Sequence, residues 1–511
     1  MHRRSLIGTA LAGIFGAALP RLATPAHAQD AAPFGFDTVI ARARAAAAEP
    51  FTDPRMALSE PFAGLSYDAF RAIRFRDEAR VFAGGGGFQM DLLPPGFHYD
   101  QRVEINVVSG GVARPLDFSA DLFTFGPNYF PYPDGRAPAG LGQGLGFSGF
   151  RLRHPLNRPD VWDEFAVFQG ASYFRAVARD TLYGLSARGI AIGTAGPDPE
   201  EFPLFKAFWI EEPAAGATTL RLYAQLDGPS VAGAYAFAIT PGTETAMQVD
   251  CRLFPRVDIN AAGIAPLTSM YYFGPESRRD IDDFRDAVHD SGGLWMVNGV
   301  GERLWRPLRN PGRVEISAFA DTNPEAFGLV QRFRDFEHFQ DAEARYELRP
   351  SAWVEPAGDW GSGLVTLIEI PTDDEATDNI VAFWRPQEPL RAGVERAYAY
   401  RLVWGQTPGE PLPLARVAAT RTGRAIVAPH EDRVFVVDFD LGQIDFETVT
   451  PRLEATAGEV KGLSVAPLPG GNLARVGFSF APNGAAQTEF RLRLESAGRP
   501  ASEIWLYRWS A

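Results

Sequence analysis

Four carboxylates stand within one short segment of the chain, directly before an apolar and aromatic run. Asp373, Asp374, Glu375 and Asp378 precede Ile380–Trp384, whose composition is that of a strand. Carboxyl groups gathered at the edge of a sheet can hold and pass protons, and cleavage of a glycosidic bond requires such transfers. A solvated acidic loop has the same composition, since charged side chains are mostly exposed. Composition alone leaves both interpretations open.

Two earlier segments also interleave acids with aromatic residues. The first runs from Asp280 to Asp290 and is followed by Trp295, and the second lies in residues 333–347. A solvated face explains either segment taken alone. Three such segments within residues 280–378 favour a sugar-binding cleft that carries two working acids.

Motifs for other chemistries are weak or missing in the sequence. Residues 144–149 match G-x-G-x-x-G, but a strand-like run rather than a helix follows them, which argues against a dinucleotide site. The histidines after residue 28 are widely spaced and form no metal-binding motif. No G-x-S-x-G elbow occurs. We therefore expect no cofactor and no catalytic metal.

The elements that must position these acids are mostly strands. Aromatic residues make up 12% of the 511-residue chain, which also holds 51 Gly and 41 Pro, a composition that favours strands and turns. Helices are expected only at 37–48, with Asp37 as the N-cap, and at 66–73. The sequence predicts an all-β protein. Its β-rich runs are residues 103–108, 165–168, 220–226, 364–370, 433–439 and 489–495.

Proline and glycine interrupt the strand pattern between residues 386 and 396. We expect a large domain over residues 29–388 and a smaller domain over residues 396–511. Short strands at regular spacing predict an immunoglobulin-like sandwich for the second domain. Cys251 is the single cysteine, so no internal disulfide can form, and its strand-like surroundings predict a buried thiol.

Residues 1–28 have the pattern of an export signal. Basic residues precede an apolar stretch, and Ala26–Ala28 reads as a cleavage site. Arg3-Arg4 fits a twin-arginine signal or an ordinary positive n-region. The segment holds three Arg and no acid, so its removal takes the formal charge from −14 to −14 − 3 = −17. Such a chain repels nucleic acid and anionic membranes, and we expect a periplasmic protein with a neutral partner.

The chain resembles the OpgG/OpgD (MdoG/MdoD) family of periplasmic glucan biosynthesis proteins, and its export signal looks more like that of the OpgD branch. The resemblance covers nearly all of the chain after the signal. It rests on the runs at residues 165–175, 183–189, 288–291, 305–308, 332–340, 344–347, 353–356, 358–361 and 378–384. It implies a large N-terminal β-sandwich with a smaller immunoglobulin-like domain.

The resemblance also implies an activity. Relatives of known activity cut or transfer β-1,2-glucan with inversion at the anomeric carbon. Their general acid corresponds to Asp378 here, and their general base to Asp290. Many relatives carry Asp where this chain has Gly292, a departure that favours transfer over hydrolysis if that Asp relays protons.

From this placement we expect the neighbouring carboxylates Asp373, Asp374 and Glu375 to keep Asp378 protonated by like-charge repulsion. The expected sugar contacts are Arg332, Asp335, Tyr346 and Trp360. A different class of function stays open: a non-catalytic protein that binds or guides β-1,2-glucan together with the membrane glucan synthase. Turnover of linear glucan distinguishes the two.

Overall fold

The computed structural model describes residues 33–278, 281–409, 413–426 and 431–511. Strands account for most of the regular secondary structure in this part of the chain, and the predicted all-β class is confirmed. The predicted export signal at residues 1–28 lies outside the described residues. All six β-rich runs expected from the sequence are strands, consistent with their β-branched and aromatic residues and the turn residues near them.

The first large sheet carries the acidic segment at one strand end. In spatial order its strands are β2 (Gln89–Leu93), β6 (Gly149–His154), β7 (Asp163–Gln169), β8 (Tyr173–Ala176), β9 (Ser186–Arg188), β15 (Ala262–Ser269), β24 (Ile380–Pro386), β23 (Ser362–Glu369) and β20 (Glu315–Thr322), with β10 (Ile190–Ile192) beside β15. β24 begins at Ile380, so Asp378 lies just before the strand.

The second large sheet is longer and runs into the C-terminal part of the chain. Its order is β28 (Val449–Ala455), β31 (Gln487–Ser496), β33 (Ile504–Ser510), β19 (Arg303–Pro307), β18 (Gly293–Val297), β21 (Ala326–Val330), β22 (Ser351–Ala357), β25 (Arg396–Gly405), β14 (Thr245–Pro255), β13 (Val231–Thr240), β12 (Leu220–Asp227), β11 (Leu204–Glu211), β3 (Glu104–Ser109) and β4 (Val112–Pro115), with β32 (Arg499–Pro500) beside β31.

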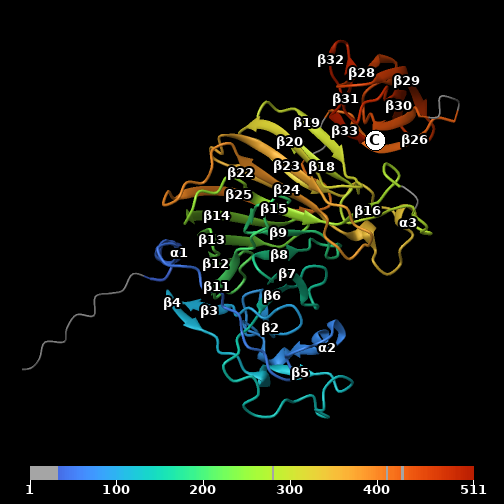
Figure 1. Ribbon diagram of the computed structural model, residues 1–511. Coiled ribbons are helices and arrows are strands. Elements are labelled where there is room, and N and C mark those ends of the chain that lie inside the picture. Colours follow the sequence, from blue (N-terminus) through green and yellow to red (C-terminus); the bar gives the residue numbers. More distant parts are fainter. Residues whose placement is uncertain (1–32, 279–280, 410–412, 427–430) are drawn as a thin grey trace, which may run out of the picture. The chain divides into compact units, whose positions relative to one another are not determined.

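Figure 1 shows the strands of the large sheets. Aromatic side chains of both sheets belong to one buried core. Phe168 of β7 lies edge-on to Phe208 of β11, with ring centroids 5.5 Å apart. Phe174 of β8 meets Phe237 of β13 in the same way, also at 5.5 Å. Cys251 is buried and free, as predicted. Edge-to-face packing of this kind holds sandwich layers in register.

A smaller sandwich forms in the C-terminal part of the chain. Its second layer is a four-stranded sheet in the order β26 (Arg416–Arg424), β27 (Arg433–Asp440), β30 (Leu473–Ala481) and β29 (Glu459–Leu468). Phe435 and Phe478 of this layer pack on Phe490 of β31 at 5.2 and 5.5 Å. Two layers around an aromatic core agree with the predicted small β-sandwich.

The predicted start of the second domain, at residue 396, cuts a strand away from its sheet. β25 pairs with β14 on one side and β22 on the other, so residues 396–405 belong to the large sheet. Tyr398, Tyr400 and Leu402 of this strand are buried in the large core. Proline and glycine marked a loop there correctly, but a loop between strands does not by itself mark a domain boundary.

Helices are few and short. α1 (Phe36–Ala47) matches the predicted helix, but its N-cap is Gly35, and Asp37 lies in the first turn. α2 (Tyr67–Arg71) is capped by Ser66, whose hydroxyl accepts a hydrogen bond from the amide of Ala69 at 3.2 Å. The remaining short elements are α3 (Phe336–Phe339), η1 (Asp77–Ala79), η2 (Ala120–Leu122), η3 (Tyr346–Leu348) and η4 (Phe446–Thr448). Within the described ranges no helix is long and apolar enough to cross a membrane.

Two small strand pairs stand beside the large sheets: β1 (Ile73–Phe75) with β5 (Phe123–Phe125), and β16 (Tyr271–Phe273) with β17 (Val288–His289). The second pair matters for the site. Tyr271 lies opposite His289, so Asp290 follows directly on a paired strand.

Candidate active site

Two consecutive backbone carbonyls, of Ser269 at the end of β15 and of Met270 just after it, anchor the segments that carry both predicted acids. The amide of Asp290 donates a hydrogen bond to the carbonyl of Met270 at 2.9 Å. The amide of Asn379 donates to the carbonyl of Ser269, the preceding residue, at 3.1 Å. Asp378 is the neighbour of Asn379 in sequence. One short segment therefore brings the two carboxylates to the same part of the protein, although they lie far apart in the chain.

Asn379 fixes the end of the acidic loop. Its side chain is fully buried, and its oxygen accepts from the amide of Tyr271 at 2.8 Å. Its amide nitrogen donates to the carbonyls of Tyr271 and Ile370, both at 2.9 Å. Because all three bonds go to the backbone, the position of Asp378 is set by its neighbour rather than by its own contacts.

Asp290 is buried and ion-paired. It is 4% exposed, and Arg349 donates to its Oδ1 at 2.7 Å. Burial raises the pKa of Asp290 to about 6, against the opposing charge of Arg349, and the negative charge of Asp378 adds to the rise. A carboxyl with this pKa can change its protonation state near neutral pH, as acid–base catalysis requires.

Asp378 lies in a more open position. Its side chain is 37% exposed, and it pairs with Arg175 of β8 at 3.9 Å. The same Arg175 lowers the pKa of Asp290, and Asp378 raises it. Both carboxylates and this guanidinium therefore interact electrostatically, which places them on one side of the molecule.

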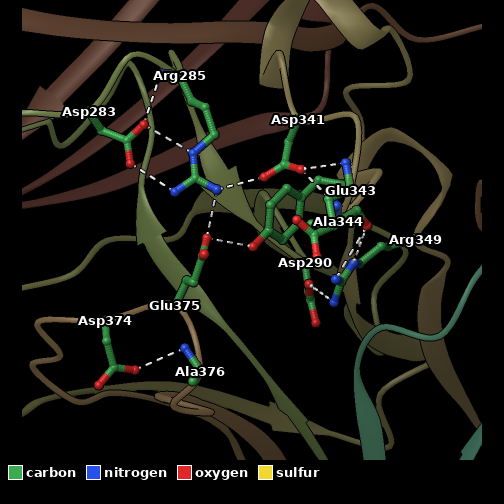
Figure 2. A network of polar contacts seen from close by, with 11 residues as sticks. Asp283, Arg285, Asp290, Asp341, Glu343, Ala344, Arg349, Asp374, Glu375 and Ala376 are labelled. Atoms are coloured by element: carbon green, nitrogen blue, oxygen red, sulfur yellow. Dashed lines mark hydrogen bonds and ion pairs between the residues drawn. The ribbon is translucent and has the colours of Figure 1, made fainter.

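Arg285 joins the segments that carry Asp283, Asp341 and Glu375 (Figure 2). It forms a two-pronged pair with Asp283, with bonds of 3.0 and 2.8 Å. Its Nη1 donates to Asp341 and to Glu375, both at 2.7 Å. The hydroxyl of Tyr346 donates to the same Glu375 oxygen at 2.9 Å. Hydrogen bonds from Arg285 hold the pKa of Asp283 below its ordinary value.

The network continues from Asp341 to Asp290. Asp341 accepts from the amide of Ala344 at 2.7 Å, and the carbonyl of Ala344 accepts from Arg349 at 3.4 Å. Arg349 also stacks on the ring of Tyr346, 4.6 Å from its centroid, before it reaches Asp290. Figure 2 shows this line of contacts from Arg285 to Asp290. The branch through Asp341 and Arg349 supports the buried Asp290. The branch through Glu375 supports the loop that carries the exposed Asp378.

The three predicted neighbours of Asp378 differ in their contacts. Glu375 is tied to Arg285 and Tyr346, which offset its charge. Asp374 is exposed and accepts from the amide of Ala376 at 2.9 Å, which shapes the loop. Asp373 is exposed. Their expected effect on the protonation of Asp378 stays a prediction.

Two predicted sugar contacts, Arg332 and Trp360, have structural partners instead. Arg332 stacks on Trp305 at 3.7 Å and pairs with Glu503 at 2.5 and 2.9 Å, which ties the large sheet to the C-terminal strands. Trp360 is 5% exposed, and its ring nitrogen donates to the carbonyl of Ala399 at 3.1 Å. Both residues contribute to packing in this structure, although Arg332 also borders a hollow of about 210 Å³. Their role as sugar contacts stays a prediction.

The other two predicted contacts lie near the acids. Tyr346 is 2% exposed, and its hydroxyl is committed to Glu375, so it supports the site from behind. Asp335 is exposed at the start of α3 and makes no capping hydrogen bond. Asp335 is thus the freer of the two to meet a ligand.

His289, beside Asp290, was not predicted. It is fully buried, stacks on Tyr271 at 5.2 Å, and receives a bond on Nδ1 from the side-chain amide of Gln331 at 3.1 Å. Burial holds the pKa of His289 well below its ordinary value. The ring is therefore a neutral wall behind Asp290.

Arginine partners were also missed. Arg175, Arg285 and Arg349 make the decisive contacts, yet each is one of many arginines in the sequence. Only tertiary structure shows which guanidinium faces a carboxylate. Within the described ranges no group of three or more His, Cys, Asp and Glu side chains could hold a metal ion.

Comparison with known proteins decides the family. Residues 34–509 match the family described as "Periplasmic glucan biosynthesis protein, MdoG". This chain belongs to that family. The "Glucans biosynthesis protein G" of Rhodopseudomonas palustris (strain ATCC BAA-98 / CGA009) is 46% identical over 519 residues, covering 100% of both chains. The protein of the same name from Vibrio cholerae serotype O1 (strain ATCC 39541 / Classical Ogawa 395 / O395) is 44% identical over 483 residues, 93% of this chain and 87% of the relative.

Family membership confirms the resemblance seen in the sequence. It gives the chain a role in periplasmic glucan biosynthesis and a location in the periplasm. Both relatives carry the name of the G protein, so the likeness of the export signal to the OpgD branch stays an expectation.

Proposed function

We propose that the protein acts on the β-1,2-glucan backbone as an anomer-inverting glycoside hydrolase or transglycosylase. The observation that carries the proposal is the shared anchor between β15 and β16, which holds Asp290 directly and Asp378 through Asn379. Two carboxyls in unlike environments, one buried and one open, are the pattern by which proteins separate acid from base.

In the proposed reaction Asp378 gives its proton to the glycosidic oxygen as the bond from that oxygen to the anomeric carbon breaks. The leaving sugar departs as a neutral alcohol. A hydroxyl group attacks the anomeric carbon from the opposite face, and its proton passes to the Asp290 carboxylate, directly or through water. When water supplies the hydroxyl the chain is cut, and when a sugar supplies it a new linkage forms and can close a ring.

Gly292 bears on the choice between water and sugar. A Cβ added at this position would meet the side-chain oxygen of Gln331 at 3.5 Å and Cε1 of His289 at 3.6 Å, both ordinary contact distances. A Cβ therefore fits at this buried position, and the melting temperature of Gly292→Asp would show whether its carboxylate is also tolerated. If a carboxylate here relays protons to water, the variant gains hydrolysis relative to transfer.

The test is incubation of the protein with linear β-1,2-glucan, followed by mass and linkage analysis of the products. New chain lengths or rings are expected, and Asp378→Asn should abolish them. If the wild-type protein binds glucan but leaves its length and linkage unchanged, the enzymatic proposal fails. The non-catalytic role beside the membrane glucan synthase then takes its place, and in cells Asp378→Asn would still support glucan production.

A further inference from the structure

A hollow of about 230 Å³ lies beside the turn that joins β7 to β8. We name it the Tyr99 hollow. Its walls come from the loop before β3, from that turn, and from the start of β11, and the residues that the argument below uses are Tyr99, Gln101, Gln169, Gly170 and Tyr173. Pockets for drug-sized ligands span about 300–1,000 Å³, so this hollow suits one small ring.

The hollow is built around Tyr99. The amide and carbonyl of Tyr99 exchange hydrogen bonds with Gly96 at 2.8 and 3.0 Å, and its ring packs on Phe70 at 5.5 Å. The opposite wall has Gly170 with φ of +81°, and a Cβ there would lie 3.2 Å from the Tyr99 ring. A side chain at this turn would therefore push the ring from its place.

The lining has few ionisable side chains, namely His98 and the tyrosines Tyr99 and Tyr173. No Asp, Glu, Lys or Arg stands among the described residues that line the Tyr99 hollow. The other large hollows differ: two near the C-terminal strands and one near β2 are each lined by several arginines together with carboxylates. A hollow without these charges in a chain of formal charge −14 favours an uncharged ligand over an ionic one.

Polar groups remain for such a ligand. Gln169 is committed, since its amide donates to Ser148 at 2.8 Å. By contrast, in the described part of the chain neither the side-chain amide of Gln101 nor the hydroxyls of Tyr99 and Tyr173 have a hydrogen-bond partner in the protein. The guanidinium of Arg188 lies over one face of the Tyr173 ring, 5.0 Å from its centroid. The remaining aromatic surface and the unpaired amide and hydroxyl groups match a sugar ring, which has apolar C–H faces and hydroxyls on its edge.

Tyr173 links the hollow to the candidate active site. It lies on β8 two residues before Arg175, so both side chains leave the strand on the same face, about 7 Å apart. Arg175 is the ion-pair partner of Asp378, at 3.9 Å. The Tyr99 hollow therefore lies next to the face that carries Asp378.

We propose that the Tyr99 hollow is a distal subsite that holds one glucosyl ring of a β-1,2-glucan chain whose reacting bond lies at Asp378. This proposal rests on the proposed function, and it adds a substrate-length requirement. A chain too short to reach from Asp378 to the hollow loses the contacts of this ring.

The experiment measures binding without turnover. Asp378→Asn protein is titrated with β-1,2-linked glucose oligomers of increasing length by isothermal calorimetry. Affinity should rise in a step when the oligomer becomes long enough to enter the hollow. Gln101→Leu, added to Asp378→Asn, keeps the shape and removes the amide, and should weaken only the longer oligomers, by about threefold to tenfold.

Tyr99→Phe is the second variant, because it keeps the ring that packs on Phe70 and removes only the hydroxyl. Gln387→Leu is the control, since Gln387 is exposed at the far end of β24. It should leave every affinity unchanged. If Gln101→Leu and Tyr99→Phe both bind all lengths as tightly as the control, the subsite is refuted while the proposed function stands. If no oligomer binds at all, both proposals fall.

Discussion

Asp290 and Asp378 share an anchor but differ in almost every other respect. Asp290 is buried, follows a paired strand and is held by Arg349 at 2.7 Å. Asp378 is 37% exposed at the end of a loop and has a looser pair with Arg175, at 3.9 Å. The buried acid takes its properties from the protein, whereas the open acid acquires a low-dielectric environment only when a ligand covers it. The comparison predicts that changes around Asp290 act through pH, and changes around Asp378 through substrate.

The largest expected effect comes from Asp378→Asn. General acid–base groups contribute about 10²–10⁴-fold, so turnover of linear glucan should fall by that factor while the melting temperature stays near the wild-type value. A substrate with a leaving group that needs no protonation should regain most of the rate. The matched variant Asp290→Asn should not be rescued in this way. If both variants respond alike to the leaving group, the division of roles is refuted.

Glu276 tests whether burial alone raises the pKa of a carboxyl group in this region. It is 5% exposed and accepts from Tyr271 at 2.5 Å, and within the described ranges it forms no ion pair. Burial raises its pKa from 4.5 to about 7. The folded state then binds more protons than the unfolded state between these values, so stability falls as pH rises through this window, by up to about 3 kcal/mol.

Glu276→Gln should remove this fall, which denaturant unfolding at pH 4.5 and pH 7.5 would measure. The variant gains most at the higher pH. An unchanged pH dependence would show that Glu276 ionises freely, and would weaken the same argument for Asp290.

Arg349 should control the pH profile. As a base Asp290 must be ionised, so the rising limb of the activity profile should pass through about pH 6. The guanidinium of Arg349 opposes the raised pKa, so Arg349→Gln should move this rise to higher pH and reduce kcat/KM at pH 5 by about tenfold per unit of displacement. Arg349→Lys keeps the charge and should stay closer to wild type. A profile that does not move would separate Asp290 from the rate.

Arg285 should have a smaller effect through position. It bonds to Asp341 on the Asp290 branch and to Glu375 on the Asp378 branch. Arg285→Gln should lower kcat by about fivefold with little change in KM, because misplaced groups slow the reaction more than they weaken binding. Arg158→Gln is the control, since Arg158 pairs with its neighbour Asp160 on the surface. Equal effects of the two variants would contradict a positioning role for Arg285.

The sequence predicted strands and the order of motifs well, because both depend on local patterns. The start of the second domain was misplaced because the pairing of β25 with β14 and β22 is a long-range property. Trp360 was a reasonable sugar contact in a Gly-rich segment, but the same aromatic surface fills the core next to Trp384 and Tyr398.

The candidate site also has residues that could be predicted from the sequence and residues that could not. Asp378 and Asp290 were found through the resemblance to a family, since acidic residues alone fit a solvated loop. The guanidinium partners could not be predicted, because many arginines compete for each carboxylate and only the fold selects among them. A neighbour's amide, such as that of Asn379, gives no signal in the sequence although it fixes the loop.

The parallel pairing of β33 with β19 has a consequence for biogenesis. The strand that covers the edge of β19 is made long after β19 itself, so a growing chain exposes an unpaired sheet edge, a surface on which other chains can add. Closing such a distant contact is slow. An export route that transports only folded proteins would limit the risk of aggregation at this edge to the compartment in which the chain is made and chaperones bind it.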